Sequence, residues 1–253
     1  MCNKKILIPT DYSDICYNAV SYGLEFCRHY GYEAEFFHVN TNNNYDEQGK
    51  IKNEELAKLY SEKFNIKYSF VEKKGDLFEA ISQEIKSNEF LFMILGTYGK
   101  NGIQLLMGSL AAKIIDFVNV PVLVVQSKKF VPFNSIVWPV SRLSGNGKGV
   151  SKIIEMASAL NAKLHMVYRT EGFETARIFQ KAFSNKVDFV LENFDESKYN
   201  GTFVTQVLGY CQHNDINMIT TVSNEVKMTT FDTRYEQFLF NIDQIPVLCV
   251  GRN

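Results

Sequence analysis

Residues 91–109 read LFMILGTYGKNGIQLLMGS, an uninterrupted apolar run followed by a glycine-rich segment. The run Leu91–Leu95 has no polar alternation, which is typical of a strand covered on both faces in a parallel sheet. Gly96, Gly99 and Gly108 follow this run, and Ser109 stands where a helical pattern begins. A buried strand that leads through glycines into a helix indicates a parallel α/β fold whose ligand-binding edge lies at this turn.

Around that segment, the first half of the chain alternates strand-like and helical patterns. Short apolar runs bounded by turn residues predict strands, and apolar residues at helical spacing predict the helices between them. Such alternation predicts right-handed crossovers and a doubly wound parallel sheet. The predicted strands are Lys5–Pro9, Glu35–Val39, Lys67–Val71, Leu91–Leu95 and Val120–Val125. The predicted helices follow Ser13 or Asp14, cover Ile51–Phe64 after a polar loop at 40–49, follow Asp76, and begin at Ser109.

The second half of the chain repeats this order. Three segments of the first half have counterparts in the second, and their recurrence in sequence predicts an internal duplication. We therefore expect two doubly wound, five-stranded parallel-sheet α/β domains, 1–128 and 133–253, joined near 127–134. The counterparts are Lys5–Pro9 with Ser135–Pro139, Ala34–Val39 with Ala162–Val167, and Val120–Val125 with Ile245–Val250. Further strands are predicted near Lys186–Leu191 and Ile216–Val222, and helices at Gly149–Leu160, Glu171–Phe183, Thr202–Asn214 and Thr230–Ile242.

Composition narrows the functional classes. The chain has 253 residues, 45% hydrophobic residues and a formal net charge of −1. Near-zero net charge argues against a broad electrostatic grip on nucleic acid or an anionic membrane. No apolar run is long enough for a transmembrane helix, and Ile6–Pro9 is too short for a signal-peptide core, so a cytoplasmic location is expected. The five cysteines are scattered without a Cys-x-x-Cys pair, which favours neither a metal site nor a disulfide framework.

Two features could carry chemistry. Glycines between a buried strand and a helix let backbone amides approach an anion, and the helix N-terminus adds donors, so residues 96–109 suit a di- or triphosphate. The alternative is that these glycines only form a turn. Asp11 follows the first strand at the same edge and could bind a ribose hydroxyl, cap the next helix together with Ser13, or do both. Neither the Walker A spacing nor the dinucleotide fingerprint is present.

These residues, in this order, resemble the universal stress protein family. The matching pieces are Ile6–Ser13, Phe37–Val39, the glycine segment with Gly108-Ser109, and Val120–Val125. The resemblance implies a sheet of order 3-2-1-4-5 and, in one branch of the family, binding of ATP with Mg²⁺ as the counter-ion of the nucleotide. It implies that Pro9 and Val39 flank adenine, that Asp11 holds the ribose, and that Gly96, Gly99, Gly108 and Ser109 hold the phosphates. Thr10 and Thr97, which stand between these positions, complete the expected nucleotide-binding set.

The chain departs from the family pattern in two places. The ATP-binding branch has nine residues between the second and third glycines of its motif, whereas only the eight residues 100–107 separate Gly99 from Gly108. In the second half, Pro139 is followed by no aspartate, and residues 223–228 hold no glycine and include Glu225, which would repel phosphate. We therefore expect no nucleotide in the second half.

Three functions compete on this basis. The first is a stress-response regulatory protein that binds ATP in its N-terminal half. The second is a scaffold or partner-interaction protein of the same fold without a nucleotide, which the shortened glycine segment favours. The third is a nucleotide hydrolase; because no general base or carboxylate cluster stands near the glycines, we expect slow hydrolysis at most.

Assembly is predicted from the last strand of each half. Pro121 precedes Val122–Val125 and Pro246 precedes Val247–Val250, and a proline near the start of a strand suits an edge position. Pairing of these two edges would join the halves as an internal pseudo-dimer, as the family resemblance also implies. The sequence leaves open whether whole chains form a homodimer.

Overall fold

The chain forms two compact units, Met1–Phe130 and Val131–Asn253. The structure is a computed structural model, and it describes residues 5–11, 14–41, 47–96, 113–115, 117–140, 147–194, 201–222, 238–239 and 241–251. No helix among these described residues is long and apolar enough to cross a membrane.

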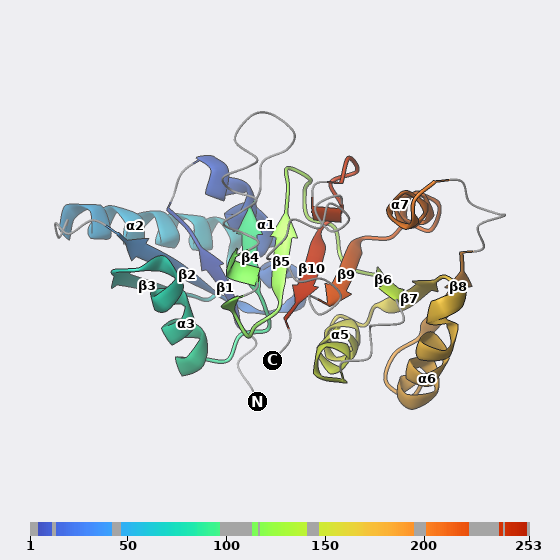
Figure 1. The fold of residues 1–253 in the computed structure, drawn as a ribbon. Coiled ribbons are helices and arrows are strands. Elements are labelled where there is room, and N and C mark those ends of the chain that lie inside the picture. The colour runs from blue at the N-terminus through green and yellow to red at the C-terminus, as the bar shows by residue number, and fades with distance from the viewer. Residues whose placement is uncertain are drawn as a thin grey trace. The chain divides into compact units, whose positions relative to one another are not determined.

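Unit 1 is a parallel sheet with helices on both faces (Figure 1). Its strands lie in the order β3-β2-β1-β4-β5, and every pairing among them is parallel. This is the order that the resemblance implies. The elements are β1 (Lys5–Pro9), α1 (Asp14–Tyr30), β2 (Glu33–Asn40), α2 (Glu47–Phe64), β3 (Tyr68–Lys74), α3 (Leu77–Ser87), β4 (Met93–Gly96) and β5 (Val122–Val125).

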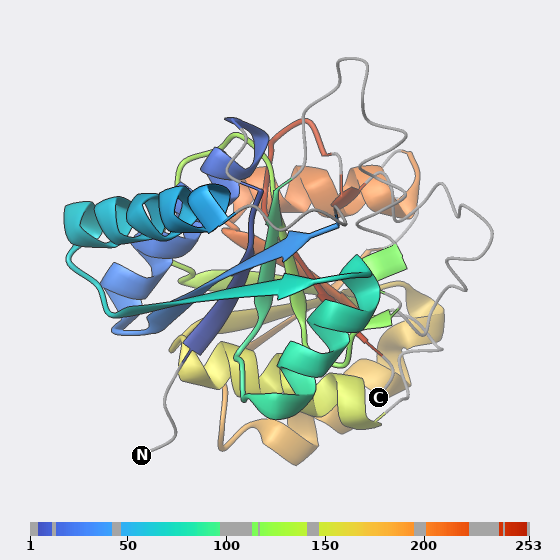
Figure 2. The ribbon, with the colours of Figure 1, turned by 90° about the vertical axis from the view of Figure 1, so that its left-hand side faces the viewer.

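The helices of unit 1 bury the central strands from both sides. Helices α1 and α2 lie together on one face of the sheet and α3 lies on the other (Figures 1 and 2). Ile6, Leu7 and Ile8 of β1 are fully buried, as expected for a strand covered on both faces. At Gly23 of α1, a Cβ atom would stand 2.8 Å from the Cδ1 of Ile8. The glycine therefore lets α1 pack closely on β1, which fixes the helix that follows the candidate site.

Unit 2 repeats the architecture with the strand order β8-β7-β6-β9-β10, again parallel throughout. Helices α5 and α6 lie on one face of this sheet and α7 on the other. The elements are β6 (Ser135–Val140), α5 (Gly147–Ala159), β7 (Lys163–Tyr168), the 3-10 turn η1 (Thr170–Gly172), α6 (Phe173–Phe183), β8 (Phe189–Asn193), α7 (Phe203–His213), β9 (Met218–Val222) and β10 (Val247–Val250).

Hydrogen bonds at equivalent positions confirm the duplication. The Met93 amide donates to the Pro121 carbonyl over 2.9 Å, and the Ile219 amide donates to the Pro246 carbonyl over 2.9 Å. The two prolines that precede the last strands therefore occupy the same place in both units, so the expected match between these segments is correct.

The expected match between the second strands is wrong by two residues. Pro9 pairs with Phe37 in unit 1, and Pro139 pairs with Val167 in unit 2, so Val167 corresponds to Phe37 rather than to Val39. A shift of two residues leaves the same side chains facing the same side of a strand. The apolar pattern alone therefore could not fix this register.

Several predicted boundaries also change. Helix α2 begins at Glu47, inside the predicted loop 40–49, and the residues 170–172 before α6 form a 3-10 turn. Of the predicted helix 230–242, the described residues 238–239 are helical and Asn241 is not. Asp14 opens α1, whereas Ser13 and the predicted helix start at Ser109 lie outside the described residues.

Candidate functional site

The carboxyl ends of three neighbouring strands gather the described part of the predicted site. Pro9 ends β1, Gly96 ends β4 and Val39 is the penultimate residue of β2. Because β2, β1 and β4 are adjacent and parallel, these residues lie at one edge of the sheet. Thr10 and Asp11 continue the chain from β1 at the same edge, where the Thr10 side chain is buried and Asp11 is exposed.

The remaining predicted residues cannot be placed from this structure. Thr97, Gly99, Gly108 and Ser109 lie outside the described residues. Their role in holding phosphates therefore stays a prediction, whereas the positions that would meet adenine and ribose are described.

Thr10 is fastened to β2 through both of its main-chain polar groups. Its amide donates to the Phe37 carbonyl over 2.9 Å. Its carbonyl oxygen lies 2.9 Å from Nδ1 of His38. A carbonyl only accepts hydrogen bonds, so the His38 ring donates through Nδ1–H. The main chain just before Asp11 is thus held to β2 through both the amide and the carbonyl of Thr10.

By strand register Pro9, Phe37 and Val39 share one face of the sheet near this edge, and the charge of the lysine beside them is neutralised. Val39 lies opposite Lys73 of β3. The Lys73 ammonium lies 2.8 Å from a carboxylate oxygen of Glu84 and 5.9 Å from the centroid of the Phe37 ring. Glu84 on α3 therefore neutralises the lysine beside the edge, and the surface next to Val39 remains suited to an apolar ring.

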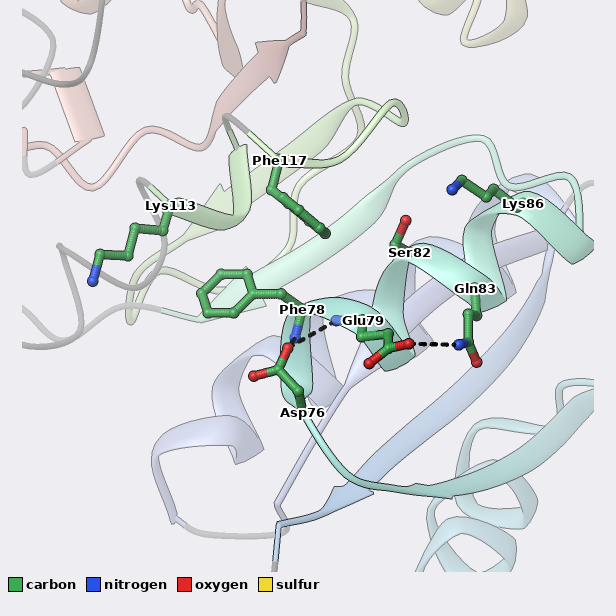
Figure 3. Close-up of a pocket in the computed structure, with 8 residues that line it drawn as sticks. All are labelled: Asp76, Phe78, Glu79, Ser82, Gln83, Lys86, Lys113 and Phe117. Atoms are coloured by element: carbon green, nitrogen blue, oxygen red, sulfur yellow. Dashed lines mark hydrogen bonds between the residues drawn. The ribbon is translucent and has the colours of Figure 1, made fainter.

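A separate groove of about 770 Å³ lies between α3 and the helical residues 113–115 and 117 (Figure 3). Phe78 and Phe117 meet in it edge to face, with ring centroids 5.7 Å apart. At one end the Asp76 carboxylate accepts the amides of Phe78 and Glu79 over 2.9 and 3.0 Å, so it caps α3 as the sequence predicted. Of the predicted nucleotide-binding residues that the structure describes, none lines this groove.

The corresponding edge of unit 2 carries different side chains. Because Val167 corresponds to Phe37, Arg169 stands where unit 1 has Val39. The Arg169 guanidinium donates to Gln206 Oε1 over 3.1 Å and lies 5.4 Å from the centroid of the Phe203 ring. Unit 2 thus has a cationic side chain at the position of Val39, one of the two apolar residues expected to flank adenine in unit 1.

The chain of unit 2 also packs closely over the end of β6. A Cβ atom added at Gly172 would stand 2.7 Å from the Val140 carbonyl oxygen and 3.0 Å from the Tyr168 Cβ. By strand register Val140 corresponds to Thr10 of unit 1. The turn η1 therefore packs against the position in unit 2 that corresponds to the candidate site of unit 1.

Two residues of these edges are not recognisable from the sequence pattern. The bond of His38 to Thr10 depends on the register of β1 and β2. Arg169 was not singled out, because the mismatch of two residues between the second strands concealed its place. Among the described residues, no group of three or more His, Cys, Asp or Glu is arranged to hold a metal ion.

Comparisons with known proteins agree with the fold. Residues 3–126 match the universal stress protein family. A universal stress protein from Archaeoglobus fulgidus DSM 4304 is 16% identical, with a TM-score of 0.76 and full coverage of both chains. A functionally unknown protein from Pseudomonas aeruginosa PAO1 is 14% identical over 98% of this chain and 92% of its own, with a TM-score of 0.62. No curated protein sequence matches the chain.

These likenesses and the strand order point to one family. The matched residues 3–126 cover unit 1 almost completely, and the likeness to the Archaeoglobus fulgidus structure extends over both units. Both units also have the strand order 3-2-1-4-5 when each is numbered from its own first strand. Unit 1 therefore belongs to the universal stress protein family, and unit 2 repeats its fold.

Proposed function

We propose that this chain is a stress-response regulatory protein that binds an adenine nucleotide, ATP with Mg²⁺, at the carboxyl edge of the unit 1 sheet. The observation that carries the proposal is the gathering of Pro9, Thr10, Asp11, Val39 and Gly96 at that edge. Ligands of doubly wound sheets bind in this place, outside the carboxyl ends of the strands.

Four of these residues each fit one part of the ligand. Pro9 and Val39 offer apolar surface to the adenine ring. The exposed Asp11 carboxylate is an acceptor that the ribose hydroxyls can reach. Gly96 has no side chain to obstruct the approach of the phosphates. Thr97, Gly99, Gly108 and Ser109 are proposed to complete the phosphate site.

Unit 2 is proposed not to bind a nucleotide. Arg169 replaces the apolar flank, and η1 packs against the end of β6 at Gly172. The sequence adds that no aspartate follows Pro139. The duplicated unit then contributes structure or a partner surface rather than a second nucleotide site.

Isothermal titration with ATP and Mg²⁺ tests the proposal. Wild-type protein is expected to bind, and Asp11→Ala should weaken binding about 10–100-fold, because a hydrogen bond to a charged group contributes about 1.5–3 kcal/mol. Asp76→Asn is the matched control, since it removes a carboxylate of the same unit while asparagine still caps α3. Absence of both heat and thermal shift at millimolar ATP would reject nucleotide binding.

The competing proposal is a scaffold of the same fold without a nucleotide. The eight-residue spacing between Gly99 and Gly108 favours it, because a missing residue could turn amides away from the phosphates. Mass spectrometry of the freshly purified protein separates the two proposals: a co-purifying adenine nucleotide argues against the scaffold. Hydrolysis of ATP, if measured, is expected to be slow.

The assembly predictions stay predictions. Pairing of residues 122–125 with 247–250 would be tested by cysteine cross-linking between the two segments. Light scattering would show whether whole chains form a homodimer.

A further inference from the structure

We propose that His38 is a positioning residue for nucleotide recognition: its imidazole fixes the Thr10 carbonyl, and this aims Asp11 at the ribose. The inference rests on the proposed function and deepens it, because it names the residue that sets discrimination for the ribose hydroxyls. His38 is not assigned a contact with the ligand.

The bond between His38 and Thr10 defines which ring nitrogen of His38 carries a proton. Nδ1 of His38 lies 2.9 Å from the Thr10 carbonyl oxygen. Because the carbonyl has no proton to give, Nδ1 must carry one, which makes the neutral ring an Nδ1–H tautomer.

The bond from His38 also fixes the orientation of the peptide plane between Thr10 and Asp11. The Thr10 amide is already held by the Phe37 carbonyl over 2.9 Å. The regular ladder between β1 and β2 ends one residue earlier, at the pair Pro9 and Phe37. With its carbonyl held as well, Thr10 presents a fixed peptide plane to the following residue, because the carbonyl of Thr10 and the amide of Asp11 belong to one planar group.

Unit 2 carries different residues at the positions of His38 and Thr10. Tyr168 stands in the place of His38, and Val140 stands in the place of Thr10. Unit 2 also lacks the aspartate that follows Thr10 in unit 1. The imidazole contact thus occurs in the unit that keeps the carboxylate, as expected if the two act together.

A pair of ligands isolates this role. ATP carries ribose hydroxyls that can donate hydrogen bonds to Asp11, whereas 2′,3′-dideoxy-ATP has the same base and phosphates without these hydroxyls. Wild-type protein is expected to prefer ATP by about tenfold or more, the value of one hydrogen bond to a charged group. His38→Leu should reduce this preference to less than about threefold, and His38→Asn should retain it, because the asparagine amide can donate from a position close to that of Nδ1.

The control is a second histidine with the same kind of bond. Nδ1 of His213 lies 2.7 Å from the Gly209 carbonyl oxygen in α7 of unit 2. His213→Leu is expected to leave both the affinity for ATP and the preference over the dideoxy ligand unchanged. A loss of preference in this variant as well would show a general effect of removing imidazoles and would overturn the inference.

The outcomes separate this inference from the proposed function. If wild-type protein binds neither ligand, the proposed function fails and the role of His38 fails with it. If wild-type protein prefers ATP and folded His38→Leu keeps the full preference, only the role of His38 is rejected. A measurement on the wild type needs no variant: the nitrogen NMR spectrum of the His38 ring should show the Nδ1–H tautomer, and an Nε2–H tautomer would overturn the inference.

Discussion

Replacing Lys5 by methionine should destabilise unit 1 more than removing its partner, Glu35. The Glu35 side chain is 3% exposed and the Lys5 side chain is 19% exposed. Their charged atoms, Lys5 Nζ and Glu35 Oε2, lie 2.8 Å apart. The Ser69 hydroxyl donates to the same carboxylate oxygen over 3.0 Å. Among the described atoms, Glu35 Oε1 has no hydrogen-bond partner, so the carboxylate depends on this one side.

The magnitudes follow from what each change leaves behind. Breaking a buried ion pair costs about 3–5 kcal/mol when the remaining charge stays buried. Lys5→Met leaves the Glu35 carboxylate with the Ser69 hydroxyl as its hydrogen-bond donor. We expect the free energy of unfolding to fall by about 3 kcal/mol, the low end of that range, because Lys5 is partly exposed. Glu35→Leu leaves a lysine that can turn to water at the start of β1, so about 1 kcal/mol is expected.

Urea unfolding followed by far-ultraviolet circular dichroism at pH 7 measures both losses. For about 3 kcal/mol, the Tm of Lys5→Met should fall by roughly 6–12 °C. The double variant Lys5→Met/Glu35→Leu should recover to within about 1 kcal/mol of wild type, because an apolar pair can replace a buried ion pair. The reasoning is refuted if Glu35→Leu is the more damaging single change, or if the double variant is as unstable as Lys5→Met.

Three further predictions concern other buried or capping groups. Burial chiefly, and Lys163 in addition, lower the pKa of His165 from 6.5. Because the folded unit then binds a proton less readily than the unfolded chain, its stability should fall as the pH drops below about 6.5. Thermal unfolding at pH 7.5 and 5 should show a smaller fall in stability for His165→Phe than for wild type. Asp76→Ala should lower the free energy of unfolding by about 1 kcal/mol, whereas Asp76→Asn should change it much less in the same urea titration. Burial raises the pKa of the Cys27 thiol and raises the pKa of Cys211 to about 12, so neither should react with a disulfide reagent at pH 8 until its unit unfolds; fast labelling of either thiol in folded protein would contradict this.

Much of the fold followed from residues whose pattern has one physical explanation. The apolar run Leu91–Leu95 contains the start of β4, where the neighbours Met93 and Ile94 are fully buried on opposite faces of the sheet. The prolines before β5 and β10 mark equivalent strand starts. The start of α2 was missed because Glu47 and its neighbours are polar, and a solvated first turn resembles a loop. The register of β7 was missed because a shift of two residues preserves the alternation.

The candidate site was predictable where it depends on strand ends. Pro9, Asp11 and Gly96 follow apolar runs directly, so the topology alone brings them to one edge. The role of His38 depends on a contact between strands that are 28 residues apart at these positions, which no local pattern encodes. Arg169 could be recognised only after the pairing of β6 with β7 was known.

The most direct test of nucleotide binding in unit 1 is an NMR titration of the isotope-labelled chain with ATP and Mg²⁺. The account predicts saturable shifts of the amides of Thr10, Asp11, Val39 and Gly96, without comparable shifts at Arg169 in unit 2. Saturable shifts confined to the groove at Phe78 and Phe117, or no shifts at millimolar ATP, would contradict it.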